Sequence, residues 1–315
     1  MTGKYRHSVY GIVIESEFRL SSIDDASEAS DPPVVSIALA APKYFQAKTG
    51  TMVCDSNDWL HHSVLPDGSI YMRADEIFET VVSANGRHAV CIKAVGADKR
   101  SFEAYLLNFV LSTSLSLQGE EPLHATVVAL GGRAIGLLGD SGAGKSTLAA
   151  FLISQGATLI TDDILRLTFT DGQAFAHQGP HRLKLFDEPA LRLLPETVGD
   201  GHWNAMNGKV MVKPHERLAG QHPPQPLCAL FWLDESKQLS APDAVSSTRL
   251  VGLDLARALF ASTMNTRFHA PDRLTRQLRF AERVARVLPV YALRYARSYS
   301  LLGQVARELG RRTAP

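Results

Sequence analysis

The sequence lacks several features that would assign a protein to a class at once. It has three cysteines in 315 residues, Cys54, Cys91 and Cys228, which are widely spaced and odd in number. A disulfide framework or a zinc site needs paired or closely spaced cysteines, so the pattern argues against both and favours a reducing compartment. No apolar run approaches the length that crosses a bilayer. Residues 1–18 lack the apolar core and cleavage site of a secretory signal, so we expect a cytoplasmic protein without a membrane partner.

The sequence also lacks an excess of charge of either sign. The formal net charge is +1, with 21% charged and 45% hydrophobic residues, which is ordinary for a soluble globular protein. A nucleic-acid partner is not expected, because such proteins usually carry a marked basic excess. A chain of this length can form one large domain or two ordinary ones. The break at residues 119–122 (GEEP) predicts a domain of residues 1–118 and a second of residues 119–315.

One stretch carries a strong chemical signal. Residues 139–146 read GDSGAGKS, a complete match to the phosphate-binding pattern G-x-x-x-x-G-K-[ST]. The apolar residues 133–138 predict a buried strand before it, and residues 146–155 predict a helix after it. Glycines let successive N–H groups point inward around phosphate oxygens, and the helix N-terminus adds its positive dipole end. The sequence therefore predicts a site for a nucleoside triphosphate.

The expected ligands of this site are ATP and Mg²⁺. Lys145 is expected to reach the β- and γ-phosphates, and the Ser146 hydroxyl to bind the metal. The guanine-reading Asn-Lys-x-Asp and the Leu-Ser-Gly-Gly-Gln of transporter ATPases are both absent, which disfavours those classes. The predicted nucleotide contacts are Gly139, Asp140, Ser141, Gly142, Ala143, Gly144, Lys145, Ser146 and Thr147.

Two adjacent carboxylates follow the next predicted strand. Asp162 and Asp163 come directly after the apolar residues 157–161. Ligands of open α/β sheets collect at the carboxyl ends of strands, so we expect this pair beside the phosphate loop. One carboxylate can hold the magnesium shell while the other takes the proton of an attacking hydroxyl. The alternatives are an exposed acidic turn, or one metal-binding aspartate with an idle neighbour.

His124, the GDSGAGKS loop and the Asp-Asp pair resemble the catalytic core of the HPr kinase/phosphorylase family. They resemble most closely its shorter members, which phosphorylate lasso-peptide precursors. The resemblance implies an α/β fold with a P-loop kinase core of the HPr kinase/PEP carboxykinase type and a mainly β N-terminal domain. It also implies that Asp162 is the general base, that Asp163 supports it and binds metal, and that His124 lies near the transferred phosphate. Without the resemblance, His124 is better explained as a satisfied core histidine; beside the phosphate, its proton could vary near neutral pH.

Several basic residues are weaker candidates. Arg182 and Lys184 alternate with leucines, so in a strand they share one face and can aim at a phosphate or an acidic acceptor; a solvated strand face is the alternative. Residues 199–226 have little periodicity and predict a long loop, which is either a lid or plain exposed chain. The basic residues that such a lid could carry to the phosphates are Lys209, Lys213 and Arg217.

The N-terminal half predicts a β-rich domain without a catalytic arrangement. Residues 7–16 and 34–40 predict strands, and residues 66–68 and 85–86 predict hairpin turns. Residues 101–118 have the apolar spacing of a helix that lapses near residues 112–114.

The leading functional hypothesis is a kinase that phosphorylates a serine-type hydroxyl of a peptide or protein. The resemblance implies the C-terminal residue of a lasso-peptide precursor as acceptor, followed by HPr or another protein serine, and homo-oligomers occur in the family. A small-metabolite kinase and a carboxykinase-like enzyme remain open, as does a non-catalytic nucleotide switch or ATPase.

Overall fold

A computed structural model describes residues 5–26, 34–50, 59–198, 202–204, 208–214, 223–234, 245–266, 268 and 271–313. The chain forms two compact units, Met1–Glu121 with Met264–His269, and Pro122–Thr263 with Ala270–Pro315. The division after Glu121 lies close to the predicted boundary. The short segment Met264–His269 was predicted in the second domain and belongs instead to the first unit.

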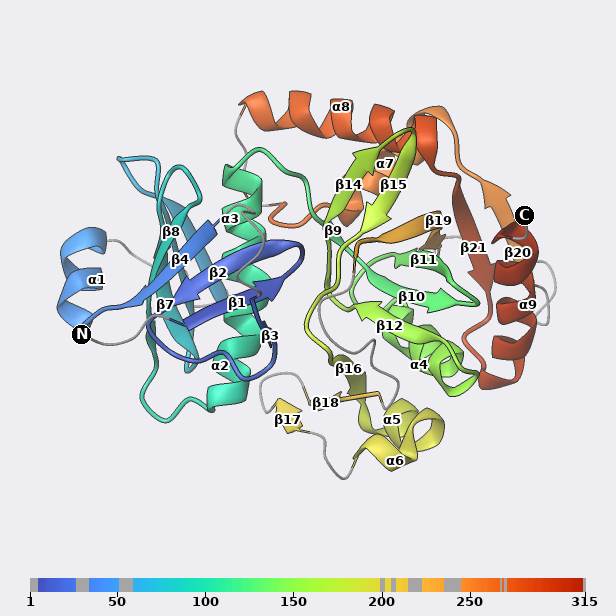
Figure 1. Cartoon of the computed structure of the whole chain (residues 1–315), viewed down its shortest axis with the longest axis horizontal. Helices are drawn as coiled ribbons and strands as arrows, with labels where there is room; N and C mark the ends of the chain where they lie inside the picture. Colours follow the sequence, from blue (N-terminus) through green and yellow to red (C-terminus); the bar gives the residue numbers. More distant parts are fainter. Residues whose placement is uncertain are drawn as a thin grey trace. The chain divides into compact units, whose positions relative to one another are not determined.

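The first unit is built on a mixed β-sheet. In its described residues, eight strands are ordered β3-β1-β2-β4-β8-β7-β6-β5 (Figure 1). Their bounds are β1 Tyr5–Val9, β2 Ile12–Ser16, β3 Asp24–Asp25, β4 Val34–Leu39, β5 Leu60–Val64, β6 Ile70–Ala74, β7 Phe78–Val82 and β8 His88–Lys93, and helix α1 spans Pro42–Thr49.

The turns of this sheet follow the local sequence. The predicted turns at residues 66–68 and 85–86 are confirmed, because they join the antiparallel pairs β5–β6 and β7–β8. The single strand predicted over residues 7–16 is wrong. Tyr10 and Gly11 have φ of +53° and +68°, which reverses the chain and makes two antiparallel strands of it.

The helix after the sheet is longer than predicted. It consists of α2 (Lys99–Tyr105), a π-helical stretch (Leu106–Val110) and α3 (Leu111–Leu117). The predicted lapse near residues 112–114 is wrong, because these residues are buried in the helix, and Ser112 and Thr113 have a polar partner. Asn265 Nδ2 donates to Ser112 Oγ at 3.1 Å, and Thr113 Oγ1 donates to Asn265 Oδ1 at 3.3 Å. A long-range partner, invisible in the local pattern, thus supports polar residues inside the helix.

The second unit is a mixed α/β structure. Its main sheet is ordered β12-β10-β11-β19-β21-β20, and β15 and β14 extend from the first residues of β19. The strands are β9 Leu123–His124, β10 Thr126–Leu130, β11 Arg133–Leu138, β12 Thr158–Thr161, β13 Ile164–Leu165, β14 Leu167–Thr170, β15 Gln173–Ala176, β16 Leu183–Phe186, β17 His202–Asn204, β18 Lys209–Val212, β19 Gln225–Leu233, β20 Val245–Arg249 and β21 Val290–Tyr295.

Helices cover both faces of this sheet because successive residues of its strands point to opposite sides. Val128 and Leu137 belong to a core shared with α4, α5 and α9, whereas Val127 and Leu138 belong to a core shared with α7 and α8 (Figure 1). No helix in the described part of the chain is long and apolar enough to span a bilayer. The helices are α4 Lys145–Ser154, α5 Asp187–Leu193, α6 Pro195–Val198, α7 Gly252–Ser262, α8 Pro271–Val287 and α9 Leu302–Thr313, with a 3-10 turn at Tyr299–Leu301.

Strand direction gathers three chain segments at one edge of the sheet. Strand β10 is antiparallel to both β11 and β12, so β11 and β12 run in the same direction. The register places Thr126 of β10 opposite Leu137 of β11, and Val127 opposite Thr161 of β12. The start of β10 therefore lies between the carboxyl ends of β11 and β12, which is where ligands of open α/β sheets bind.

A small sheet occupies part of the predicted loop at residues 199–226. Strand β18 pairs antiparallel with both β16 and β17, so the prediction of a continuous loop is wrong for these residues. Arg217 lies outside the described residues.

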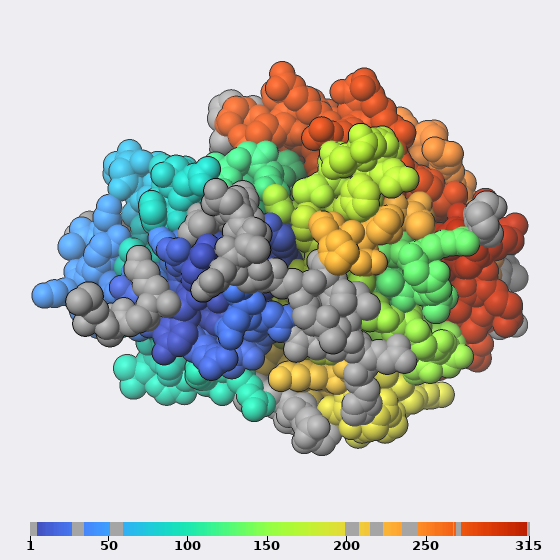
Figure 2. All heavy atoms as spheres, in the orientation of Figure 1, coloured from blue at the N-terminus to red at the C-terminus, as the bar shows by residue number. Residues whose placement is uncertain are grey.

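Strands β14 and β15 form an antiparallel hairpin that turns at Asp171 and Gly172. In the space-filling view its yellow-green atoms lie on the surface of the second unit beside the orange atoms of α8 (Figure 2). Phe169 of the hairpin meets Phe280 of α8 edge-on, with ring centroids 6.3 Å apart, and the Arg283 guanidinium lies 4.9 Å from the centre of the Phe169 ring. These contacts fix the hairpin to the helix that covers the sheet.

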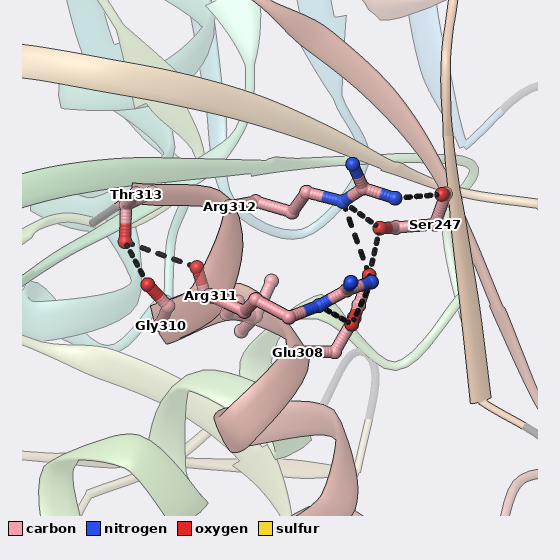
Figure 3. A network of polar contacts seen from close by, with 7 residues as sticks. Ser247, Glu308, Gly310, Arg311, Arg312 and Thr313 are labelled. Atoms are coloured by element: carbon pink, nitrogen blue, oxygen red, sulfur yellow. Dashed lines mark hydrogen bonds and ion pairs between the residues drawn. The ribbon is translucent and has the colours of Figure 1, made fainter. Parts of the chain in front are cut away.

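A polar network fixes the last helix to strand β20 (Figure 3). The Glu308 carboxylate accepts hydrogen bonds from Ser247 Oγ, from Arg311 Nε at 2.8 Å and from Arg312 Nε at 3.1 Å. Arg312 also donates to the Ser247 carbonyl at 2.8 Å. Because several charge-assisted bonds converge on one largely buried carboxylate, this network is worth more than an exposed ion pair.

We expect Glu308→Ala to loosen α9. Loss of the shared carboxylate removes bonds to three side chains, and hydrogen exchange of the α9 amides should quicken by about tenfold or more, measured by mass spectrometry. Glu282→Ala is the matched control, because it removes an exposed helical pair with Arg286. Equal effects of the two variants on their own helices would contradict the structural role of the network.

Candidate functional site

The loop between β11 and α4 has a backbone that only glycine accommodates easily. Gly139, Gly142 and Gly144 have φ of +139°, +89° and +92°. A Cβ atom on Gly139 would lie 3.1 Å from Ala143 Cβ and 3.2 Å from the Leu233 carbonyl oxygen, which is tighter than most Cβ contacts in proteins. The strand, the glycine-rich turn and the helix therefore follow in the predicted order.

Lys145, the first residue of α4, turns back over this loop. Its Nζ donates to the carbonyl oxygens of Gly139 at 2.8 Å and Asp140 at 3.0 Å. Burial lowers its pKa to about 8, partly offset by the nearby Asp162 and Asp163 carboxylates. The ammonium is thus a desolvated cation at the centre of the loop, where an anionic ligand would be attracted strongly.

Asp162 is buried at the end of β12, with 5% of its surface exposed. One carboxylate oxygen accepts from Thr126 Oγ1 at 2.7 Å, and the other accepts from the Lys184 backbone N–H at 3.0 Å. Burial, followed by the charge of Asp163, raises the pKa of Asp162 to about 6. The predicted alternative of an exposed acidic turn is therefore wrong.

Asp163 forms an ion pair with the side chain of Lys184. Its backbone is in the left-handed region, with φ of +72°. The Lys184 ammonium lies 2.6 Å from Asp163 Oδ2, and 19% of the Asp163 side chain is exposed. One residue, Lys184, thus contacts both aspartates, Asp162 through its backbone and Asp163 through its side chain.

His124 lies in the short strand β9, directly opposite Ile164 of β13. This pairing brings it next to the aspartate pair in the fold. Burial, and then the charge of Lys145, lower the pKa of His124 to about 4. The prediction that its proton varies near neutral pH is wrong for the free protein, because the ring is neutral there.

The predicted basic residues separate into different settings. Arg182 and Lys184 are both buried, so the alternative of a solvated strand face is wrong. Arg182 precedes β16, whereas Lys184 lies within it. Lys213 is exposed after β18. Lys209 contributes to the lowered pKa values of Lys145 and His124, so its ammonium lies in the same electrostatic neighbourhood.

Thr126 and the Lys184 backbone were missed by sequence reasoning. Thr126 is a hydroxyl in an otherwise apolar strand, TVVAL, and it begins the strand whose start faces the loop edge. That pattern is a usable signal, since a buried hydroxyl needs a hydrogen-bond partner. The backbone N–H of Lys184 carries no sequence signal at all.

The oxygen atoms at this edge suit a hard divalent cation. The Ser146 hydroxyl and the Asp163 carboxylate are ligand types that Mg²⁺ prefers, and the Lys184 ammonium on Asp163 shows that this position accepts a cation. In the described residues, no cluster of three or more His, Cys, Asp or Glu side chains could hold a metal. Mg²⁺ usually binds through one or two protein oxygens, substrate phosphates and water.

Comparison with known proteins gives distant likenesses among the solved structures. No family model matches the chain, and no curated protein matches it. The solved structures that match include the HPr(Ser) kinase/phosphatase from Coxiella burnetii, at 11% sequence identity and a TM-score of 0.33. The match covers 60% of this chain and 94% of that protein. So distant a likeness assigns no activity, and the function proposed below depends on the residues of the second unit.

The raised pKa of Asp162 predicts how stability depends on pH. Asp162 titrates near 3.8 in the unfolded chain and at about 6 in the fold, so the folded state holds the proton more tightly. Its contribution is fully present below the unfolded pKa and is lost as the pH rises through about 6. We expect Asp162→Asn to raise the melting temperature by a few degrees at about pH 8, with a smaller gain at about pH 4.

The substitution is sterically matched, because an asparagine can accept from the Lys184 N–H and donate to Thr126 Oγ1. Asp171→Asn, in the exposed turn between β14 and β15, is the control and should leave the melting temperature unchanged at both pH values. A lower melting temperature for Asp162→Asn at about pH 8 would contradict the buried, destabilising charge.

Proposed function

We propose that this protein is a kinase that transfers the γ-phosphoryl group of ATP to a serine-type hydroxyl of a peptide or protein. The observation that carries the proposal is the buried Asp162 carboxylate at the sheet edge formed by the end of β12 and the start of β10. The GDSGAGKS loop follows β11 at the same edge. A phosphate-binding loop and a poised carboxylate are the two parts that phosphoryl transfer to a hydroxyl requires.

The loop would hold the triphosphate. Its positive-φ glycines leave backbone N–H groups free to face phosphate oxygens, and α4 directs its N-terminal dipole toward them. Lys145 would exchange the carbonyls of Gly139 and Asp140 for phosphate oxygens, which are stronger partners for an ammonium. Since its pKa is about 8, bound phosphates would keep it protonated at neutral pH.

Asp162 would act as the general base. A carboxylate with a pKa of about 6 is ionised at neutral pH and accepts a proton more readily than an ordinary aspartate does. Its hydrogen bonds to Thr126 and the Lys184 amide fix the carboxylate against rotation. The acceptor hydroxyl would lose its proton to Asp162 as its oxygen approaches the γ-phosphorus.

Magnesium would be held by Ser146 and Asp163, and when bound it neutralises charge that develops on the phosphate oxygens. His124 is neutral near pH 7 and can give or accept a hydrogen bond beside the transferred group without adding charge.

The acceptor is proposed from the resemblance of His124, the loop and the aspartate pair to the HPr-kinase-like proteins. That resemblance favours the C-terminal residue of a lasso-peptide precursor, with HPr, another protein serine or a small metabolite as alternatives. We also propose a cytoplasmic location, no nucleic-acid or membrane partner, and self-association.

Phosphate transfer from γ-labelled ATP with Mg²⁺, read by mass spectrometry, tests the proposal. The acceptors are a precursor peptide ending in serine, HPr, free serine and water. We expect one phosphoryl mass on the peptide, and a loss of about a hundredfold or more in Asp162→Asn, which cannot accept the proton. Asp171→Asn should transfer normally. Hydrolysis of ATP by water alone, equal in the wild type and Asp162→Asn, would instead identify a nucleotide switch or ATPase.

The acid side of the pH profile gives a second test. Protonation of Asp162 removes the base, so kcat/KM should fall about tenfold per pH unit below about pH 6. Thr126→Val removes a hydrogen bond that stabilises the ionised carboxylate, and it should therefore move this fall to higher pH. An unchanged midpoint in Thr126→Val would contradict the assignment of the acid side to Asp162.

A further inference from the structure

Lys184 makes two contacts of different kinds with the aspartate pair. Its backbone N–H donates to Asp162 Oδ2 at 3.0 Å, and its Nζ lies 2.6 Å from Asp163 Oδ2. The Lys184 side chain is 11% exposed, so this ion pair is largely shielded from water. The backbone contact is fixed by the pairing of β16 with β18, whereas the ammonium sits at the end of a flexible four-carbon chain.

The charge balance of the site makes this ammonium necessary in the absence of ligands. Adjacent carboxylates at a partly buried edge are costly unless a cation compensates them. Lys145 is engaged elsewhere, because its Nζ bonds to the carbonyls of Gly139 and Asp140. The Lys184 ammonium, in contrast, lies directly on a carboxylate of the pair, at Asp163.

We propose that Lys184 is a built-in counter-ion that occupies the cation position of Asp163 until a divalent metal and a nucleotide enter together. This regulation rests on the function proposed above. In the free protein the ammonium neutralises Asp163 and so weakens the binding of a metal ion on its own. When a nucleotide is bound, the phosphate oxygens offer the ammonium a new partner, and Asp163 becomes available to the metal.

Two features of the chain make this exchange feasible. Rotation of the Lys184 side chain leaves its backbone in β16, so the N–H bond that orients Asp162 is preserved. A lysine ammonium is a point charge with three donors, and it can change from a carboxylate to a phosphate without the planar alignment that arginine requires. The site therefore stays ordered while a metal ion replaces the Lys184 ammonium at Asp163.

The binding of Mn²⁺ to the full, nucleotide-free chain tests this inference, measured by electron paramagnetic resonance of the free ion. The wild type should bind weakly at Asp163. Lys184→Met removes the competing charge and should bind at least about tenfold more tightly, whereas Lys184→Arg keeps the charge and should stay weak. Asp163→Asn, added to Lys184→Met, should abolish the gain. Lys48→Met, which breaks the Lys48–Asp67 ion pair in the first unit, is the matched control.

Lys184→Gln serves as a second neutral variant if Lys184→Met does not fold, and circular dichroism verifies the fold of each. Unchanged Mn²⁺ affinity in a folded neutral variant would overturn the inference. The result is separate from the transfer assay, because Mn²⁺ binding needs neither ATP nor an acceptor. A gain in Mn²⁺ affinity without transfer to any acceptor would support the counter-ion while contradicting the kinase. Normal phosphoryl transfer by the wild type, together with unchanged Mn²⁺ affinity in the neutral variants, would support the kinase and contradict the counter-ion.

Discussion

The constraint on which the site of this protein depends is a buried carboxylate, Asp162, beside a partly buried one, Asp163, at one sheet edge. A charged carboxylate is stable in such a place only if hydrogen bonds and a cation replace the water that it loses. Thr126 and Lys184 come from strands on either side of the aspartates in the sequence, and together they provide this compensation. The electrostatics of the site therefore depend on the correct folding of β10, β12 and β16.

The strand directions explain why the phosphate loop and the carboxylates share that edge. A hairpin, β10–β11, leads into the loop, and β12 returns beside β10 in the direction of β11. Two hydrophobic cores, one on each face of the sheet, hold these strands between helices. A rigid sheet with both faces covered positions short polar side chains more precisely than loops do, which suits a reaction that depends on positioning.

The charged groups of the site also destabilise the fold locally. The pKa of Asp162 is raised because its charged form is disfavoured, and that of Lys145 is lowered for the same reason. Such opposed shifts in a carboxylate and an amine gathered at one edge are typical of functional sites, where stability is given up for reactivity. The Glu308 network shows the contrasting arrangement, in which arginines near the surface satisfy a carboxylate that fixes α9 to β20.

The sequence by itself determined the strand, glycine-rich turn and helix around residues 139–146, because this pattern depends on local residue types and spacing. It also placed Asp162 and Asp163 after a strand. It could not give the long-range partners. The burial of Ser112 and Thr113 depends on Asn265, the small sheet of β16, β17 and β18 depends on pairing across distant segments, and Asp163 takes a left-handed backbone that no aspartate dictates. Only the tertiary structure put Thr126 and Lys184 on the aspartates and lowered the pKa of His124, because hydrogen bonds and desolvation act through space and leave no trace in local sequence.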